Sequence, residues 1–234
     1  MSRLLEICAA SLPSALAAQA GGAHRIELCQ NLEQGGTTPS YGLIKAVRAR
    51  LRIPVFVLIR PRAGGFVYSA DELAIMRADI EACRALGCAG VVLGALDAAG
   101  RVDQAACQAL IAAAGPLCVT FHRAFDACPD QPGALEAVIA LGCQRVLTSG
   151  GQLTAEAGQN QLAALVVQAA GRVRIMPGAG ITASNIQTLA AHTGAPEFHA
   201  SAKRLVPAEA SAGLFATPQF ETDAALVAEL VALL

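Results

Sequence analysis

The sequence predicts a single α/β domain with the architecture of a (β/α)8 barrel, also called a TIM-type barrel. The 234 residues are 54% hydrophobic and only 15% charged, which indicates one folded domain with a large apolar core. Strand-like apolar runs alternate eight times with helix-like windows, at a spacing of about 29 residues. Because such a barrel takes about 250 residues, eight units of this size match the length of the chain.

Glycine or proline separates most predicted helices from the next predicted strand. Gly22, Gly87, Gly142 and Gly194 each lie a few residues before a strand. Glycine adopts the left-handed conformation that ends helices, and proline stands before the third and fifth strands. The predicted strands are 4–8, 25–28, 55–60, 90–93, 117–122, 145–148, 173–176 and 197–199. The predicted helices are 12–20, 42–51, 69–86, 104–114, 132–141, 161–170, 183–192 and 223–233.

A doubly wound open sheet is the alternative architecture. It would carry fewer units at this length and a glycine-rich turn after its first strand, where this chain has Cys8-Ala-Ala-Ser11. Residues 203–221 contain two prolines and a glycine, and we expect a long, irregular last loop there rather than a domain boundary. Residues 223–233 are expected to form a closing helix, so the whole chain 1–234 is predicted as one domain.

The composition and charge of the sequence indicate which binding partners and which cellular location to expect. The net charge is −1, from 17 basic and 18 acidic residues without a basic stripe, which disfavours nucleic acid. No uninterrupted apolar run approaches 18 residues, so no membrane span is expected. Glu6 and Pro13 interrupt the apolar start, unlike a secretion signal. The eight cysteines include no C-x-x-C spacing, and we expect reduced thiols in a cytoplasmic protein.

Polar side chains alternate with apolar ones in the first two strands. Glu6 and Cys8 share one face of the first strand, and Glu27 and Cys29 share one face of the second. The opposite, apolar face should meet the helices, so these four side chains are expected inside the barrel near its C-terminal mouth. A structural layer of ion pairs is the alternative, but barrel sites lie at this end and favour a functional interpretation. The same reasoning places Arg60, His122, Glu197, His199 and Ser201 at this end.

Glycine-rich loops follow the predicted sixth and seventh strands. Gly178-Ala-Gly180 precedes a polar helix start, and backbone N–H groups at such a start bind anions. Arg60-Pro-Arg62 resembles an anion-facing loop because its first arginine ends a strand. The alternative is that the glycines only form tight turns. The ligand-binding candidates are Arg62, Ser149, Gly150, Gly178, Gly180, His199 and Ser201.

Two functions fit these residues, and the first is binding of copper as Cu(I). Thiolates are soft ligands that select Cu(I). Cys8 and Cys29 end neighbouring strands on the same face, so a site with two thiolates is geometrically possible, with Met176 or a histidine as a third ligand. The alternative is that the two cysteines only pack in the core.

The second is an enzyme that acts on a small anionic substrate bearing a phosphate or carboxylate. Glu6 or Glu27, with a pKa raised by burial, would be the general base, and His122 would be the acid or proton shuttle. Arg60 would hold the anion, and Asp126 would orient His122 or Arg123. No lysine ends a strand, which disfavours a Schiff-base aldolase, while metal-assisted chemistry through the carboxylates remains open. The catalytic candidates are Glu6, Glu27, Arg60, His122 and Asp126.

Seven groups of residues occur in a specific order up to about residue 202. They are Leu5-Glu-Ile-Cys8; Arg25-Ile-Glu-Leu-Cys29 with Gly35-Gly36 and Thr38-Pro-Ser40; Ile59-Arg-Pro-Arg62 with Phe66 and Tyr68-Ser69; Val119-Thr-Phe-His-Arg-Ala-Phe-Asp126; Arg145-Val-Leu-Thr-Ser-Gly150; Met176-Pro-Gly-Ala-Gly180; and His199-Ala-Ser-Ala202. The combination resembles the copper homeostasis protein CutC family. The resemblance implies a TIM-type barrel, a cytoplasmic homodimer or higher homo-oligomer, and a link to copper tolerance and Cu(I) binding. It implies no agreed enzymatic activity.

The chain departs from the pattern of that family in four places. His24 stands where aspartate is common, and Phe56 stands where histidine is frequent. The loop 63–66 lacks an acidic residue, and the tail after residue 203 is short and divergent.

Overall fold

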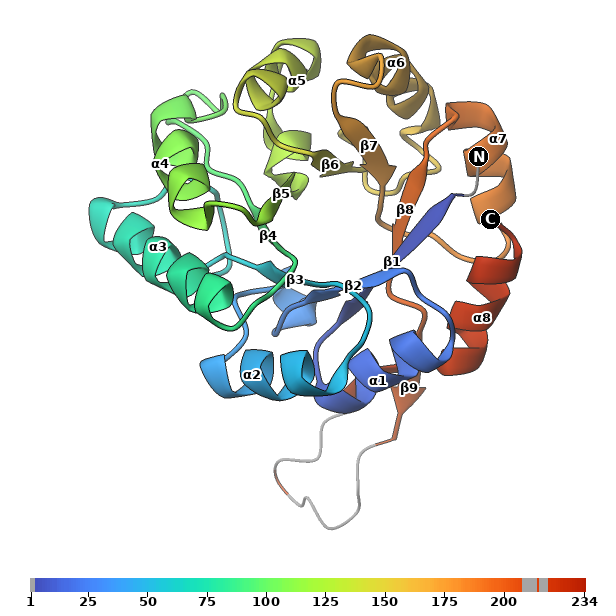
Figure 1. The fold of residues 1–234 in the computed structure, drawn as a ribbon. Helices are drawn as coiled ribbons and strands as arrows, with labels where there is room; N and C mark the ends of the chain where they lie inside the picture. The colour runs from blue at the N-terminus through green and yellow to red at the C-terminus, as the bar shows by residue number, and fades with distance from the viewer. Residues whose placement is uncertain (1–2, 208–213, 215–218) are drawn as a thin grey trace.

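The computed structural model describes residues 3–207, 214 and 219–234. Eight parallel strands follow one another around a nearly closed barrel, and β1 pairs with β8, which brings the first and last barrel strands together (Figure 1). This arrangement confirms the predicted (β/α)8 barrel over the open sheet. The barrel strands are β1 (Leu4–Ala9), β2 (Arg25–Leu28), β3 (Val55–Leu58), β4 (Gly90–Leu93), β5 (Cys118–Phe121), β6 (Arg145–Thr148), β7 (Arg174–Pro177) and β8 (Glu197–Ala200).

Eight α-helices form the outer ring around these strands (Figure 1). Serine or aspartate caps most of them, as at Ser69, whose hydroxyl accepts from the Glu72 N–H while the Glu72 carboxylate accepts from the Ser69 N–H. These caps satisfy N–H groups that have no partner inside the helix. The helices are α1 (Leu12–Ala20), α2 (Tyr41–Arg50), α3 (Ala70–Ala85), α4 (Gln104–Ala114), α5 (Gln131–Ala140), α6 (Gln159–Ala169), α7 (Ile186–Thr193) and α8 (Ala224–Ala232).

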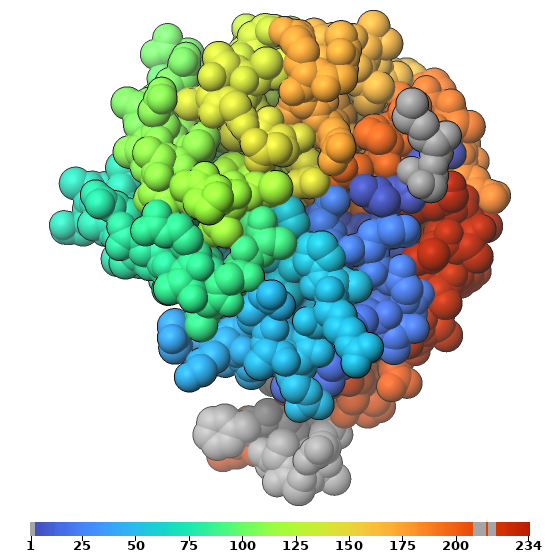
Figure 2. Space-filling view, in the orientation of Figure 1, coloured from blue at the N-terminus to red at the C-terminus, as the bar shows by residue number. Residues whose placement is uncertain are grey.

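The apolar core lies between the strands and the helices, as the alternation predicts. Leu5 and Ile7 of β1 and Ile26 and Leu28 of β2 are fully buried there. Side chains also close the centre of the ring, so the space-filling view shows no open channel through the barrel (Figure 2). The inward-facing side chains, rather than an empty bore, therefore determine what the barrel can bind.

The stretch predicted as an irregular last loop is ordered at both ends, which corrects that expectation. β9 (Lys203–Val206) pairs antiparallel with β10 (Gln219–Thr222), and Leu205 lies opposite Phe220. In the sequence, Pro207 directly follows β9 and Pro218 directly precedes β10. Residues 208–213 and 215–218 of the predicted loop fall outside the described residues. The closing helix is present as α8.

Two short 3-10 helices complete the loops at the C-terminal ends of the strands, namely η1 (Leu32–Gln34) after β2 and η2 (Arg123–Ala127) after β5. Among the described residues, none of the helices has the length and apolar character needed to span a membrane.

Candidate functional site

A cluster of buried charges fills one level of the barrel interior. Arg25 of β2 donates from Nε to Glu6 Oε2 at 2.5 Å and from Nη2 to Glu197. Arg145 of β6 donates from Nε to Glu197 Oε2 at 2.7 Å. The more exposed Arg174 of β7 donates from Nη1 to Glu197 Oε1 at 3.1 Å. The Arg25, Arg145, Glu6 and Glu197 side chains are all less than 10% exposed. Burial of these charges is tolerated because each is paired.

Both buried arginines contact the ring of Phe56 on β3. The Arg25 guanidinium carbon lies 5.5 Å from the centre of the Phe56 ring, and that of Arg145 lies 5.0 Å from it. The ring fits because β4 offers Gly90, where a Cβ atom would lie 2.3 Å from the nearest Phe56 ring atom. The attraction between these two cations and the aromatic ring stabilises this level of the barrel.

The sequence analysis did not single out Arg25 and Arg145. Each stands two residues before an inward-facing residue of its strand, Glu27 and Leu147 respectively, so the same alternation of faces could have identified them. Met176, considered as a third copper ligand, lies in this level, where its sulfur is 3.0 Å from Arg25 Nη2.

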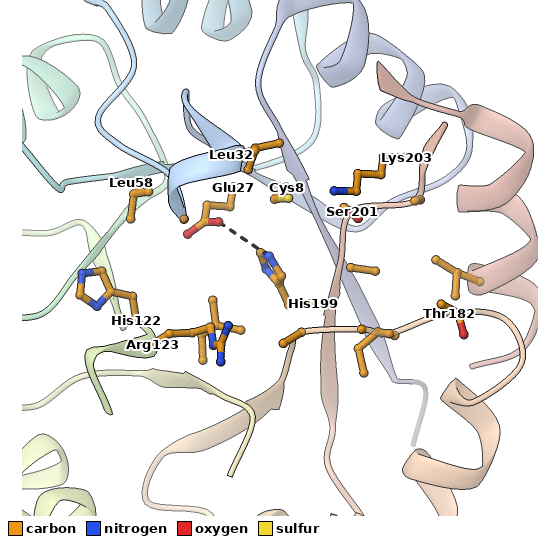
Figure 3. A pocket seen from close by; sticks show the side chains of 18 of the residues that line it. Cys8, Glu27, Leu32, Leu58, His122, Arg123, Thr182, His199, Ser201 and Lys203 are labelled. Carbon is orange, nitrogen blue, oxygen red and sulfur yellow. Dashed lines mark ion pairs between the residues drawn. The ribbon is translucent and has the colours of Figure 1, made fainter. Parts of the chain in front are cut away.

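His199 of β8 joins the charged level to the mouth of the barrel. Its Nδ1 atom lies 2.7 Å from Glu6 Oε1 and its Nε2 atom 3.8 Å from Glu27 Oε2, the pair that Figure 3 marks with a dashed line. Burial opposes the charged imidazole, but hydrogen bonds with Cys8 and Glu6 and the negative charge of Glu6 raise the pKa of His199 well above its ordinary value. His199 is therefore an imidazolium at neutral pH.

The two glutamates beside His199 differ in protonation. Burial would raise the pKa of Glu6, but the charges of Arg25 and His199 outweigh it and lower the pKa to about 2. Burial raises the pKa of Glu27 to about 8, against the attraction of His199. Glu6 is consequently a fixed anion inside the barrel, whereas Glu27 carries a proton that it can transfer near neutral pH.

Cys8 and Cys29 meet at the end of β1 and just beyond β2. Both are buried and pack in one small apolar cluster, and the Cys29 thiol donates to the Ala9 carbonyl at 3.8 Å. The neighbouring Cys29 thiol lowers the pKa of Cys8 well below its ordinary value, with help from a hydrogen bond and the positive charge of His199 and against the effect of burial. The neighbouring Cys8 sulfur and burial raise the pKa of Cys29. The pair thus favours one thiolate and one thiol.

Among the described residues, no group of three or more His, Cys, Asp or Glu side chains has an arrangement that could hold a metal ion. A metal ion at the thiol pair would therefore find no third ligand of these four residue types in the part of the chain that the structure describes.

A cavity of about 870 Å³ lies next to the thiol pair, and Figure 3 shows side chains from several strand ends around it. Its walls are mainly apolar and also carry charged and polar side chains from several elements, a mixture that is usual for sites that bind small molecules. Leu226 and Leu230 of α8 also line it, although the sequence analysis assigned no role to that helix. The predicted site residues in the wall are Cys8, Glu27, Arg60, His122, Gly180, His199 and Ser201.

Arg60 lies in the cavity wall, but three of its hydrogen bonds go to the backbone. Nη1 donates to the carbonyls of Gln34 at 3.1 Å and Gly36 at 2.8 Å, and Nη2 donates to the carbonyl of Gly64 at 2.7 Å. The side chain therefore ties together the loops that follow β2 and β3. Its guanidinium also lies over the Phe66 ring, 5.1 Å from the centre.

His122 also packs against Phe66, with 5.0 Å between the His122 and Phe66 ring centres. Its Nδ1 atom accepts the N–H of Ala124 at 3.1 Å, which leaves the ring proton on Nε2. The imidazole fits against β4 because Gly94 has no side chain there: a Cβ would lie 2.7 Å from Nδ1. Burial and the charge of Arg60 lower the pKa of His122 to about 3, so the ring is neutral at physiological pH.

The remaining predicted residues do not line the cavity. Several of them instead hold the loops around it in place. Asp126 accepts from Arg123 Nε at 2.7 Å and from the Ser149 N–H, and contacts Arg123 rather than His122. Arg62 pairs with Glu72 at 2.5 Å on the surface. The predicted residues outside the wall are Glu6, Arg62, Asp126, Ser149, Gly150 and Gly178, together with Cys29 behind Cys8.

Comparison with known proteins finds similarity along most of the chain. A sequence model described as the CutC family matches residues 3–204. A family protein CutC of Xylella fastidiosa is 60% identical over 204 residues, which cover 87% of this chain and 76% of that protein. The human copper homeostasis protein cutC homolog is 48% identical over 200 residues, covering 86% of this chain and 73% of the human protein.

A solved structure is also similar. The crystal structure of the putative copper homeostasis protein CutC from Streptococcus agalactiae superimposes with a TM-score of 0.81 at 39% identity. The match covers 84% of this chain and 97% of that chain. The family match ends at residue 204, so α8 and its cavity-lining residues lie beyond it.

Proposed function

The chain belongs to the CutC family, and from this premise we propose that it acts in copper homeostasis in the cytoplasm and binds Cu(I) through Cys8 and Cys29. The names of its human and streptococcal relatives support the copper role. Thiolates are soft ligands that prefer Cu(I) to harder cations. All eight cysteines are free thiols, the state expected in a reducing compartment.

The contact between the two buried thiols is the observation that carries this proposal. Because the pKa of Cys8 is lowered, its proton is readily displaced, and binding of Cu(I) by both sulfurs is opposed mainly by the proton of Cys29. Two thiolates and one Cu(I) carry a net negative charge, and the imidazolium of His199 lies beside them to balance it. Cys8 lines the cavity, which gives the ion a path from solvent.

Replacement of both cysteines, Cys8→Ser with Cys29→Ser, should weaken Cu(I) binding by at least about a hundredfold, because serine hydroxyls are not soft ligands. The affinity is measured without oxygen by competition with the coloured Cu(I) chelator bicinchoninate.

The matched control is Cys83→Ser with Cys88→Ser, which removes a second pair of neighbouring thiols near the opposite end of the barrel. This variant should bind Cu(I) as the wild type does. Undiminished binding by the Cys8 and Cys29 variant, or loss of binding only in the control, would contradict the proposed site.

A second candidate function is an enzyme that acts on a small anionic molecule in the cavity. The neighbouring groups Glu27 and His199 favour it, because one is a protonated carboxyl with a pKa of about 8 and the other an imidazolium. Groups with such shifted pKa values are typical of acid–base sites. Glu6 is too firmly held by Arg25 and His199 to serve as the general base, so Glu27 is the carboxyl group for proton transfer.

A further inference from the structure

Arg60 is a buried cation without an anionic partner. The residue is 6% exposed, and its three hydrogen bonds all go to neutral backbone carbonyls. No carboxylate of the described residues forms an ion pair with it. A buried charge is costly unless it is paired, so the fold leaves room for an anion that the chain does not supply.

The nearest protein candidates for this anion do not fill the role. Tyr68 lies close enough to feel the Arg60 charge, but burial raises the pKa of its phenol above the ordinary value, and the hydroxyl stays neutral. Glu27 pairs with His199 instead. The counter-charge has to come from a ligand.

His122 supplies a second donor in the same part of the cavity. It is 4% exposed, and its Nε2 atom has no hydrogen-bond partner among the described residues, as is also true of Arg60 Nε. Because Nδ1 accepts from the Ala124 N–H, Nε2 carries the proton and can only donate. A buried N–H group without an acceptor loses the energy of a hydrogen bond, which a ligand oxygen would restore.

We propose that the end of the cavity between Arg60 and His122 binds the carboxylate of a small organic acid. Both residues lie against Phe66, and both line the cavity. The carboxylate accepts from the guanidinium and from His122 Nε2–H. The apolar body of the acid then lies on Leu58, Phe66 and Leu147 of the cavity wall.

A carboxylate fits this position better than a phosphate does. At this end of the cavity one buried guanidinium and one neutral imidazole balance a single negative charge, because the other arginine in the wall, Arg123, is already paired with Asp126. A phosphate monoester carries about 1.5 to 2 negative charges at neutral pH. Guanidinium groups also match the planar, two-oxygen shape of a carboxylate.

This inference deepens the second candidate function by naming the group that the cavity recognises. It does not depend on copper, because neither Arg60 nor His122 contacts the thiol pair. The variant with Cys8→Ser and Cys29→Ser should therefore keep its affinity for the acid even where its Cu(I) binding is lost, so the two proposals fail separately.

Titration with phenylacetate, followed by calorimetry, tests the proposal. An acid of this size should bind the wild type with a Kd of a few millimolar at ordinary efficiency per atom. The uncharged isostere phenylacetamide should bind at least about tenfold more weakly, because it cannot neutralise Arg60. This comparison uses the wild-type protein, so it stays decisive if a variant fails to fold.

Variants at the histidine test its donor role. His122→Leu removes the N–H and should weaken phenylacetate binding about tenfold, whereas His122→Gln keeps both an acceptor and a donor and should retain most of the affinity. His192→Leu, which changes an exposed histidine on α7, serves as the control and should bind as the wild type does.

Three results would overturn the proposal. They are no saturation of the wild type by about 20 mM phenylacetate, equal affinity for phenylacetate and phenylacetamide, and tighter binding of inorganic phosphate than of phenylacetate.

Discussion

Replacement of Glu197 by leucine is expected to lower the free energy of unfolding by about 3–5 kcal/mol. Glu197 is 1% exposed and accepts hydrogen bonds from Arg25, Arg145 and Arg174. Without it, Arg25 keeps only Glu6 as a partner, and Arg145 keeps no carboxylate at all. Removal of one partner from a buried ion pair costs far more than the pair contributes, because the remaining charge stays away from water.

Urea unfolding at neutral pH measures this loss. Glu136→Leu is the control, because Glu136 pairs with Arg172 on the surface, where both side chains are about half exposed. That variant should lose far less stability than Glu197→Leu, because an exposed ion pair is screened by water and contributes little. Addition of Arg145→Met to Glu197→Leu should recover part of the loss, since it removes the unpaired cation. Equal losses for Glu197→Leu and Glu136→Leu would show that the buried cluster contributes nothing beyond a surface pair.

The eightfold alternation of strands and helices was sufficient to predict the barrel, and the alternation of faces along the strands predicted the inward direction of Glu6, Cys8, Glu27 and Cys29. Alternation is a local property, since neighbouring side chains on a strand must point to opposite faces. Which charges pair inside the barrel is not local. Arg145 and Glu197 are 52 residues apart and come together only when β6, β7 and β8 are curved around a common axis.

The strand-end residues show the same limit. The sequence placed Arg60 at the mouth, but its hydrogen bonds to the loops after β2 and β3 depend on how those loops fold back. Asp126 stands four residues after His122, yet the turn of η2 directs it to Arg123 and the loop after β6. The role of α8 in the cavity wall could not be predicted, because it depends on where the divergent tail returns to the barrel.

Acidification should lower the free energy of unfolding through protonation of His122. Burial and Arg60 lower the pKa of this imidazole from 6.5 to about 3 in the folded state. Between pH 6.5 and 3 the unfolded chain therefore binds a proton that the folded chain does not bind, so the free energy of unfolding falls as the pH falls. At pH 4.5, two units below the unfolded value, the loss from this residue is about 3 kcal/mol relative to pH 7.5.

The comparison of the wild type with His122→Gln isolates this contribution, because glutamine has the hydrogen-bonding groups but does not titrate. Urea unfolding at several pH values between 7.5 and 4.5 should give two curves that converge on acidification, since only the wild type loses the histidine contribution. Glu6, whose lowered pKa also destabilises the fold in acid, is common to both proteins and cancels in the difference. His192→Gln, at the surface, should run parallel to the wild type. Parallel curves for His122→Gln as well would mean that His122 is hydrated in the folded protein and is not the buried, neutral donor on which carboxylate recognition depends.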